Sequence, residues 1–432
     1  MPTATADQLE QRLRDYRLGA PFDGDISASW VLPNYRGHSL ANIPATVAAL
    51  FGVEQGEMAP PLDPIYWQGF GDIRHVVVTL VDALGYLQLN QMLAEHPNCI
   101  WAQLASQGIY QPLTSICPST TATALSTVMS GAEPISHGLL GYELWLREYG
   151  VLTQMLAITP ALSPKAETLI DWGLEPESFL PVKTLAERLE PQGIAAHTLV
   201  NRQYTRGGLT RMAYPGFRVE GHKSVNDMWR RAYRQLKRAG DAPSYHFIYW
   251  GALDTAIHRH GTADGKWQEQ FQVVTEAAER HFFRRLGQQE RQNTLFVLIA
   301  DHGFIDSPVG DAFDTDHSAF LQDEMLVPHS GEARCSFLHC RQGDEPSVQQ
   351  ALQDELGERW SVVRTDEAIR AGLFGHGQTA PESTARLGHF IALSRDLSYL
   401  DRGQKRHVLR GRHGGLTAEE MLIPWLAARL DG

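Results

Sequence analysis

The hydrophobic pattern alternates between short apolar runs and amphipathic stretches, which is typical of an α/β protein. Near-continuous apolar runs at 75–81, 245–250 and 294–300 indicate parallel strands buried on both faces. Further strands are predicted at 109–117, 195–200, 333–340 and 388–394. Helical spacing predicts helices at 5–17, 39–51, 122–130, 225–238 and 266–286. We therefore expect a central, mostly parallel sheet flanked by helices.

Residues 151–244 read differently from the rest, with many prolines, short strands and basic-aromatic patches. We expect residues 1–150 and 245–432 to form the α/β core, and 151–244 to form an inserted cap. Arginines in this stretch could contact a substrate phosphate, although charged side chains are more often simply exposed to solvent. They are Arg202, Arg206 and Arg211.

Composition narrows the class of protein. The 432-residue chain is 43% hydrophobic and 20% charged, as ordinary globular proteins are. Its formal net charge of −12 argues against general nucleic-acid binding, which requires a basic footprint. Neither a secretory signal nor an apolar run of roughly 20 residues is present, so we expect a cytoplasmic protein without membrane association. The four cysteines form no C-x-x-C pair and are expected to be free thiols. Oligomeric state is not indicated by the sequence.

Carboxylates follow the three strongest strands, at Asp82, Asp254 and Asp301. Open α/β sheets place their sites at the carboxyl ends of their strands, so these positions are candidates for a shared site. Taken singly, an aspartate after a strand is more often a turn or cap residue. The grouping is what favours a site.

Histidines accompany these carboxylates. His258 lies one helical turn after Asp254, His302 follows Asp301 directly, and His413 stands beside two glycines. Asp and His together suit zinc or a similar divalent ion, and six such side chains are enough for two metals. Two metals about 4 Å apart can stabilise the entering and leaving oxygens of an in-line displacement. A surface ion pair at 254–258 and a simple loop around His413 are the alternatives.

A hydroxyl cluster lies between the strand at 109–117 and the helix at 122–130. It comprises Ser119, Thr120 and Thr121, with Thr123 following. The N-terminus of a helix can hold an anion, and a hydroxyl there is placed to act as a nucleophile. Helix capping is the more common role of such residues. The residues alone leave both roles open.

The order of these residues resembles the alkaline phosphatase superfamily, most closely its type I phosphodiesterase/nucleotide pyrophosphatase branch. The resemblance rests on Pro118-x-x-Thr121, Gly131 and Ser136-His137-Gly138, which match the nucleophile segment of that branch without a gap. The segments Ile299–Gly303 and His413–Gly415 match as well.

The resemblance implies two divalent metal ions, most readily zinc, with manganese as the alternative. Asp254, His258 and His413 would hold one ion. The other would be held by Asp82, Thr121, Asp301 and His302. Thr121 would be the nucleophile and form a covalent phosphothreonine, which water then displaces. The register favours Thr121 over its hydroxyl neighbours.

This chain departs from the branch at two points. Residues 122–125 read Ala-Thr-Ala-Leu where the branch has Phe-Pro-Asn-His, and Tyr142 stands where the branch has a phosphate-binding asparagine. A phenol can donate the same hydrogen bond, although core packing is an equally good account of Tyr142. We therefore expect a phosphodiesterase or nucleotide pyrophosphatase acting on a small phosphate ester, nucleotides included. A phosphomonoesterase or phosphotransferase on the same metal cage is the alternative. A non-catalytic binding module is disfavoured by the intact set of ligands.

Overall fold

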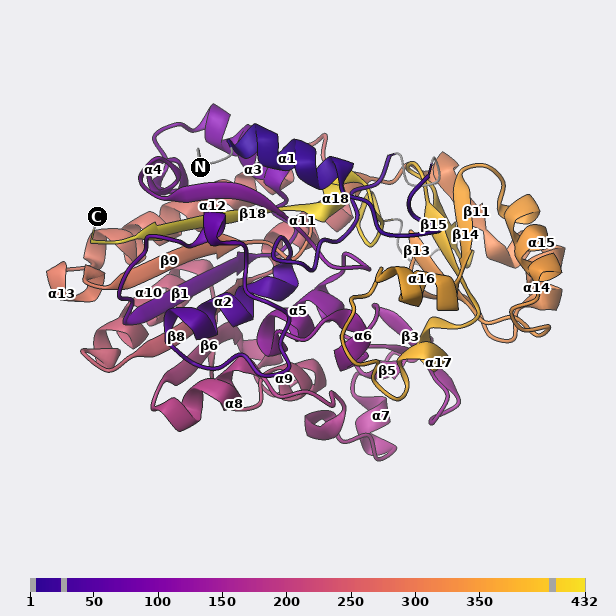
Figure 1. Ribbon diagram of the computed structural model, residues 1–432, viewed down its shortest axis with the longest axis horizontal. Helices are drawn as coiled ribbons and strands as arrows, with labels where there is room; N and C mark the ends of the chain where they lie inside the picture. The colour runs from indigo at the N-terminus through magenta and orange to yellow at the C-terminus, as the bar shows by residue number, and fades with distance from the viewer. Residues whose placement is uncertain (1–4, 25–28, 404–408, 432) are drawn as a thin grey trace.

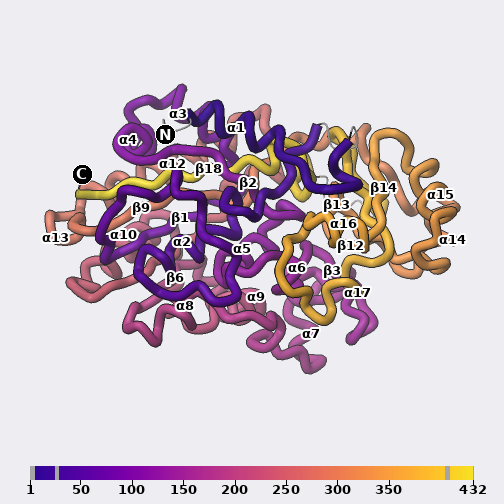
Figure 2. The backbone as a smooth tube through the Cα atoms, viewed as in Figure 1, coloured from indigo at the N-terminus to yellow at the C-terminus, as the bar shows by residue number. Residues whose placement is uncertain are grey.

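A computed structural model describes residues 5–24, 29–403 and 409–431. Two seven-stranded sheets lie along the long axis of the molecule, and Figure 1 shows sheet A on the left and sheet B on the right. The N-terminal segment crosses both, as the indigo tube in Figure 2 shows. Trp30 on this segment donates its indole N–H to the carbonyl of Ser394 in sheet B, at 3.0 Å. The segment therefore ties the two halves together.

Sheet A is the central, mostly parallel sheet that the sequence predicts. Its strands, in spatial order, are β2 (Ile109–Thr114), β18 (Leu422–Arg429), β9 (Thr294–Ile299), β1 (His75–Val81), β8 (Ser244–Trp250), β6 (Ala195–Asn201) and β7 (Arg218–His222). Strand β18 runs antiparallel to both of its neighbours, and the pairs from β9 to β7 are parallel. The prediction of an α/β fold is confirmed.

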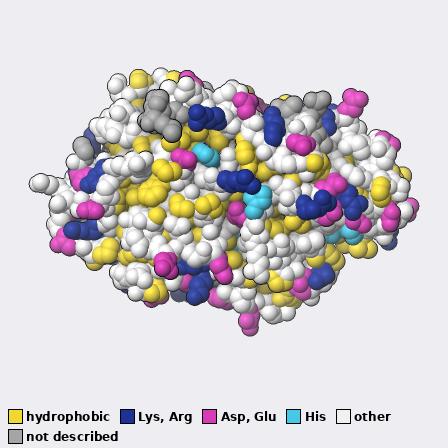
Figure 3. All heavy atoms as spheres, viewed as in Figure 1, with side chains coloured by type: hydrophobic (Ala, Val, Ile, Leu, Met, Phe, Trp, Pro, Cys, Tyr) yellow, Lys and Arg dark blue, Asp and Glu magenta, His cyan; other side chains and the backbone are white. Residues whose placement is uncertain are grey.

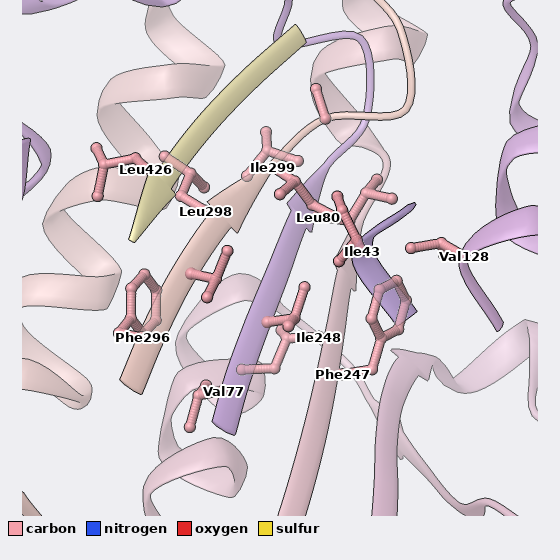
Figure 4. Close-up of a cluster of buried hydrophobic side chains, with 14 of the residues drawn as sticks. Ile43, Val77, Leu80, Val128, Phe247, Ile248, Phe296, Leu298, Ile299 and Leu426 are labelled. Atoms are coloured by element: carbon pink, nitrogen blue, oxygen red, sulfur yellow. The ribbon is translucent and has the colours of Figure 1, made fainter. Parts of the chain in front are cut away.

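Helices flank sheet A because its central strands are apolar on both faces. They include α1 (Ala6–Asp15), α2 (Ile43–Leu50), α3 (Tyr86–Glu95), α4 (Ile100–Gln107), α5 (Thr121–Ser130), α8 (Leu185–Leu189), α10 (Val225–Ala239), α11 (Ala252–His260) and α12 (Lys266–His281). Figure 4 shows Ile43 of α2 and Val128 of α5 beside Phe247 of β8. The neighbouring Ile248 points to the other face, as strand alternation requires.

Sheet B is the second large sheet, and its strands come from several separate parts of the chain. Its strands are β14 (Trp360–Arg364), β15 (Phe390–Ser394), β13 (Cys335–Leu338), β12 (Ser330–Glu332), β3 (Glu143–Leu146), β4 (Val151–Gln154) and β5 (Thr159–Pro160). Helices α14 (Ala319–Glu324) and α15 (Pro346–Leu356) cover its outer end (Figure 1). Sheet B therefore draws on chain segments far apart in the sequence.

The expected cap at 151–244 is only partly a separate unit. Strands β6 and β7 belong to sheet A, and α10 packs on them, so much of 195–239 is part of the core. A strand at 195–200 was predicted, but its local pattern does not show which sheet it joins. Sheet B takes four of its strands from residues 330–394.

Strand β18 was not predicted from the sequence, because Pro424 interrupts an alanine-containing run. In the structure Pro424 lies opposite Pro112 of β2. Two residues without N–H groups thus share one position of the ladder, which a proline can occupy only where no donor is required. The long-range pairing explains what the local pattern could not.

Several expectations from composition can be compared with the structure. Within the described ranges, no helix is long and apolar enough to cross a membrane. Cys99, Cys117, Cys335 and Cys340 are free thiols, and all but Cys99 are buried. On the face shown in Figure 3, Lys and Arg side chains lie among Asp and Glu side chains. That face carries no broad basic surface of the kind that nucleic-acid binding requires.

Candidate active site

The three strand-end carboxylates meet at one edge of sheet A. Asp82 follows β1, Asp301 follows β9 after one residue, and Asp254 lies in the first turn of α11, just after β8. These three strands are parallel neighbours, so their carboxyl ends coincide. Gly303, two residues after Asp301, lets this loop pack closely on α18 (Ala418–Met421), because a Cβ there would lie 1.9 Å from the carbonyl oxygen of Glu419. The structure thus places Asp82, Asp254 and Asp301 at the same edge of sheet A.

One candidate metal-binding group consists of Asp254, His258 and His413, whose ligand atoms all lie within 4.8 Å of one another. The Nε2 atom of His258 is 3.2 Å from Oδ1 of Asp254 and 3.3 Å from Nε2 of His413. His413 reaches the group from the far end of the chain, on the loop that follows β17 (Gly411–Arg412).

A second group consists of Asp82, Asp254 and His302, whose ligand atoms also lie within 4.8 Å of one another. The Nε2 atom of His302 is 3.6 Å from Oδ1 of Asp82 and 3.5 Å from Oδ2 of Asp301. Asp254 belongs to both groups. The structure thus brings together all six Asp and His residues that the sequence singled out.

The three imidazoles share one hydrogen-bonding arrangement. The Nδ1 atoms of His258, His302 and His413 each lie 2.9 Å from a backbone carbonyl oxygen, of Gly411, Gly303 and Ser119 respectively. A carbonyl only accepts, so each Nδ1 carries the proton and each Nε2 presents a lone pair. Lone pairs of His258 and His413 facing each other at 3.3 Å repel unless a cation lies between them. This arrangement fits metal binding.

The carboxylates of Asp82 and Asp301 are each hydrogen-bonded through only one of their two oxygens. Oδ2 of Asp82 accepts a hydrogen bond from the Tyr249 hydroxyl, and Oδ1 of Asp301 accepts from the backbone N–H groups of Ala83 and His302, each at 3.0 Å. The other oxygen of each carboxylate is buried and has no hydrogen-bond partner among the described residues. Both free oxygens lie beside Nε2 of His302. A cation bound between these two carboxylates would give both buried oxygens a partner.

The electrostatics of the site support the same conclusion. Burial, followed by the nearby charges of Asp301 and Asp254, raises the pKa of Asp82 well above its usual range. Burial also raises the pKa of Asp254, and burial with two neighbouring imidazoles lowers the pKa of His413. Clustered anions of this kind need a counter-charge to ionise together. Divalent cations would supply that charge.

Thr121 lies at the first position of α5, beside the second group. Its Oγ1 is 3.3 Å from Nε2 of His302. The residue before it, Thr120, is the N-cap, yet its side chain makes no capping hydrogen bond. Side-chain capping therefore does not explain this cluster, and the first-turn N–H groups of α5 keep their capacity to bind an anion.

The other hydroxyls of the cluster are placed less well for attack. Ser119 donates its hydroxyl to the carbonyl of Gly415 at 2.8 Å, and Thr123 is fully buried. Thr120 and Thr121 both line a cavity of about 750 Å³ between the two sheets, together with Asp254, His258 and His413. Of these two hydroxyls, only that of Thr121 is hydrogen-bonded to a predicted metal ligand within the described chain.

Tyr142 lines the same cavity, at its sheet B side. Burial, followed by the charges of Glu143 and Glu332, raises the pKa of its phenol to about 12. The phenol is therefore protonated at neutral pH and can donate a hydrogen bond.

Further polar residues of the cavity were not foreseen from the sequence. They include Glu143, Asp316, His329, Glu332, Asp401, Arg402 and Arg412. Arg412, next to His413, was the only one with a sequence signal, and its guanidinium lies 4.0 Å above the Tyr399 ring. Arg402 is paired with Glu143. None of Arg202, Arg206 and Arg211 lines this cavity, and Arg211 instead pairs with Glu177 at the surface.

His137, in the Ser136-His137-Gly138 segment, is hydrogen-bonded to Thr127 of α5. Its protonation is expected to make stability depend on pH. Its Nδ1 accepts from the N–H of Leu139 at 3.1 Å, so its Nε2–H donates to the hydroxyl of Thr127 at 2.9 Å. Burial, with the charge of Arg386, lowers the pKa of His137 to about 3. An unfolded histidine has a pKa of about 6.5. At a pH between about 3 and about 6.5, the unfolded chain therefore holds a proton on His137 that the folded chain does not.

Stability is therefore expected to fall as the pH drops below about 6.5, by up to about 1.4 kcal/mol per pH unit for this histidine. His137→Gln removes one titrating group, so its thermal midpoint should decline less steeply between pH 7 and pH 5 than that of the wild type. Thermal unfolding followed by circular dichroism measures both slopes. Equal slopes would show that His137 is not the buried neutral group described here.

Comparisons with known proteins bear on this geometry. The family model for type I phosphodiesterase / nucleotide pyrophosphatase matches residues 76–416. The chain belongs to this family. It is accordingly an enzyme of the phosphoester hydrolase type, and the family implies divalent metal cofactors. The expected resemblance is confirmed. No curated protein matches the sequence at a significant level.

Two solved structures are similar in fold to this chain. Murine ectonucleotide pyrophosphatase/phosphodiesterase 5, an inactive threonine-to-alanine variant in complex with AMP, has 15% identity and a TM-score of 0.62, covering 82% of this chain and 87% of its own. Phosphonoacetate hydrolase from Sinorhizobium meliloti, in complex with phosphonoformate, has 15% identity and a TM-score of 0.59, covering 83% and 90%. At these identities the similarity shows a shared fold.

Proposed function

We propose that the protein is a two-metal phosphodiesterase, with Thr121 as the nucleophile. The observation that carries this proposal is the position of the Thr121 hydroxyl. It lies at the N-terminus of α5, 3.3 Å from Nε2 of His302, and faces the cavity shared with Asp254, His258 and His413. The inactive threonine-to-alanine variant of the murine relative is in keeping with a threonine nucleophile.

The candidate ligands would form two metal positions. Asp254, His258 and His413 would hold one divalent ion, and Asp82, Thr121, Asp301 and His302 the other. When bound, two such ions would lower the pKa of the Thr121 hydroxyl and neutralise charge that develops on the phosphoryl oxygens. Zinc suits this mixture of imidazole and carboxylate ligands best, with manganese as the second candidate.

The reaction then proceeds in two displacements. Oγ1 of Thr121 attacks phosphorus and an alcohol leaves, which forms a phosphothreonine that keeps the second ester group of a diester substrate. The oxygen of a water molecule next bonds to phosphorus as the bond from phosphorus to Oγ1 breaks. Oγ1 takes up a proton from that water, and a phosphate monoester departs. The first-turn N–H groups of α5 and the phenol of Tyr142 would hold the phosphoryl oxygens through both steps.

The substrate would be a small phosphate ester, and a nucleotide is the example that the AMP complex of the murine relative suggests. A cavity of about 750 Å³ has room for a substituent on phosphorus of that size. The enzyme would act in the cytoplasm, where its four thiols stay reduced.

Substrate preference is tested by comparing bis-p-nitrophenyl phosphate with p-nitrophenyl phosphate on the zinc-loaded enzyme. We expect a higher kcat/KM for the diester, because the cavity accommodates a second substituent. Equal or faster turnover of the monoester would favour a phosphomonoesterase or phosphotransferase on the same metal cage. Absence of bound divalent metal after zinc loading would instead favour a non-catalytic binding module.

Tyr142→Phe provides a finer test of the cavity. Loss of the hydroxyl should lower kcat/KM for the diester by about tenfold, the effect expected of one lost hydrogen bond to a charged oxygen. Metal content should be unchanged. Tyr149→Phe, which alters a tyrosine that does not line the cavity, is the matched control. Wild-type kinetics for Tyr142→Phe would assign this phenol to packing alone.

A further inference from the structure

A buried ion pair lies directly behind the loop that carries His413. Nε of Arg334 donates to Oε1 of Glu420 at 2.8 Å, and Nη2 donates to Oε2 at 3.1 Å. Both side chains are 0% exposed. Neither Arg334 nor Glu420 is among the described residues that line the cavity. The proposed reaction does not use this ion pair.

The pair is connected to the metal-binding loop through Gly415. The N–H of Gly415 donates to Oε1 of Glu420 at 2.9 Å, and a Cβ at this position would lie 2.7 Å from Oε2. Thr417 adds its hydroxyl to Oε2 at 2.9 Å. Glu420 thus fixes the backbone two residues after His413.

The opposite side of the loop is held by the nucleophile turn. The N–H of Gly414 donates to the hydroxyl of Ser119 at 3.1 Å, and Nδ1 of His413 donates to the Ser119 carbonyl at 2.9 Å. The loop is therefore clamped between Ser119 and Glu420. With the loop held on both sides, Nε2 of His413 lies 3.8 Å from Oδ1 of Asp254.

Arg334 extends this clamp into sheet B. Its Nη1 donates to the carbonyl of Ser398 at 2.8 Å and to the hydroxyl of Ser394 at 3.2 Å. A guanidinium can make these bonds together because its donors are fixed in one plane, whereas a lysine ammonium cannot reproduce the two-pronged geometry. Apolar residues of similar volume could serve stability as well as a buried ion pair does. Apolar residues could not, however, accept the hydrogen bonds that Glu420 receives from Gly415 and Thr417.

We propose that the Arg334–Glu420 pair is a positioning device that sets the affinity of the Asp254–His258–His413 metal site by fixing the loop of His413. This inference rests on the proposed function, since it requires His413 to be a metal ligand. Groups that orient a metal ligand typically change metal affinity by about 10- to 100-fold when they are removed.

The test is zinc titration of the metal-free protein in competition with a chromophoric chelator. Arg334→Lys and Glu420→Gln should each weaken one of the two zinc sites by about tenfold and leave the other unchanged. Arg386→Lys is the matched control, because Arg386 is also buried and bonded to a carbonyl, that of Gly138, but does not contact this loop. It should bind both zinc ions with wild-type affinity.

A double-mutant cycle separates positioning from general stabilisation. In a His413→Ala background, Arg334→Lys should cost no further zinc affinity, because the ligand it positions is gone. A further tenfold loss in that background would overturn the inference, as would wild-type zinc binding by both pair variants. If those variants do not fold, Thr417→Val loosens Glu420 without removing its charge, and the same two outcomes decide.

Failure of this inference is distinguishable from failure of the proposed function. If His413→Ala leaves both zinc affinities unchanged, the metal assignment itself is wrong and the positioning role falls with it. If His413→Ala weakens one site but the pair variants do not, the metal assignment stands and only the positioning role is overturned.

Discussion

Replacing Thr121 by alanine is expected to lower diester turnover by about 10³-fold or more, because the first displacement loses its nucleophile. Both divalent ions should remain bound, since Asp82, Asp301 and His302 are unchanged. Steady-state kinetics with bis-p-nitrophenyl phosphate and metal analysis of the same sample give the two values.

The neighbouring hydroxyl provides the control for this substitution. Thr123→Ala removes the same atoms two residues later in α5, but Thr123 is fully buried and does not line the cavity. It should keep turnover near that of the wild type. Substantial activity in Thr121→Ala would show that another group attacks phosphorus, and the assignment of the nucleophile would have to be withdrawn.

The second large effect is expected at Asp254, which belongs to both candidate metal groups. Asp254→Asn keeps the shape of the side chain but removes its charge. We expect bound divalent metal to fall from two equivalents to less than one, and turnover to fall by about 10³-fold or more. Metal analysis after dialysis against a weak chelator, followed by kinetics on the same sample, measures both.

Asp264→Asn is a matched control for Asp254→Asn. Asp264 also pairs with a histidine four residues away, His260, at 3.0 Å, yet this pair is exposed and lies outside both metal groups. Its loss should leave metal content and turnover unchanged. Retention of two metals by Asp254→Asn would contradict the ligand assignment.

The strand ends of the site could be predicted from the sequence because their signals are local. A buried parallel strand reads as a continuous apolar run, and the residue that follows it lies at the edge where sites form. Asp82 and Asp301 satisfied both conditions, and Asp254 followed its strand after one short turn. The observed bounds of β1, β8 and β9 agree closely with the predicted runs.

Other parts of the cavity depend on contacts between distant segments and carry no local signal. Glu332 meets Tyr142 because β12 pairs with β3, with almost two hundred residues between them in the chain. Arg402, just after β16 (Tyr399–Asp401) of a separate two-stranded sheet, pairs with Glu143 of β3. Such contacts form only when distant segments assemble in the fold, so the sequence around each residue does not predict them.

The histidines illustrate the same division between local and long-range information. Their identity and spacing indicated a metal site, but the sequence could not show which nitrogen faces the metal. The three carbonyl acceptors at Nδ1, on Gly411, Gly303 and Ser119, decide this, and two of them lie on segments remote from the histidine they orient. The orientation of a ligand is therefore a property of the fold.

The most direct test of the central claim is the stereochemical course of hydrolysis at phosphorus. A phosphorothioate diester of known configuration would be hydrolysed in isotopically labelled water, and the configuration of the product determined. Each in-line displacement inverts phosphorus, so two successive displacements through Thr121 predict net retention. Net inversion would mean that water attacks the substrate directly, and would contradict a covalent phosphothreonine.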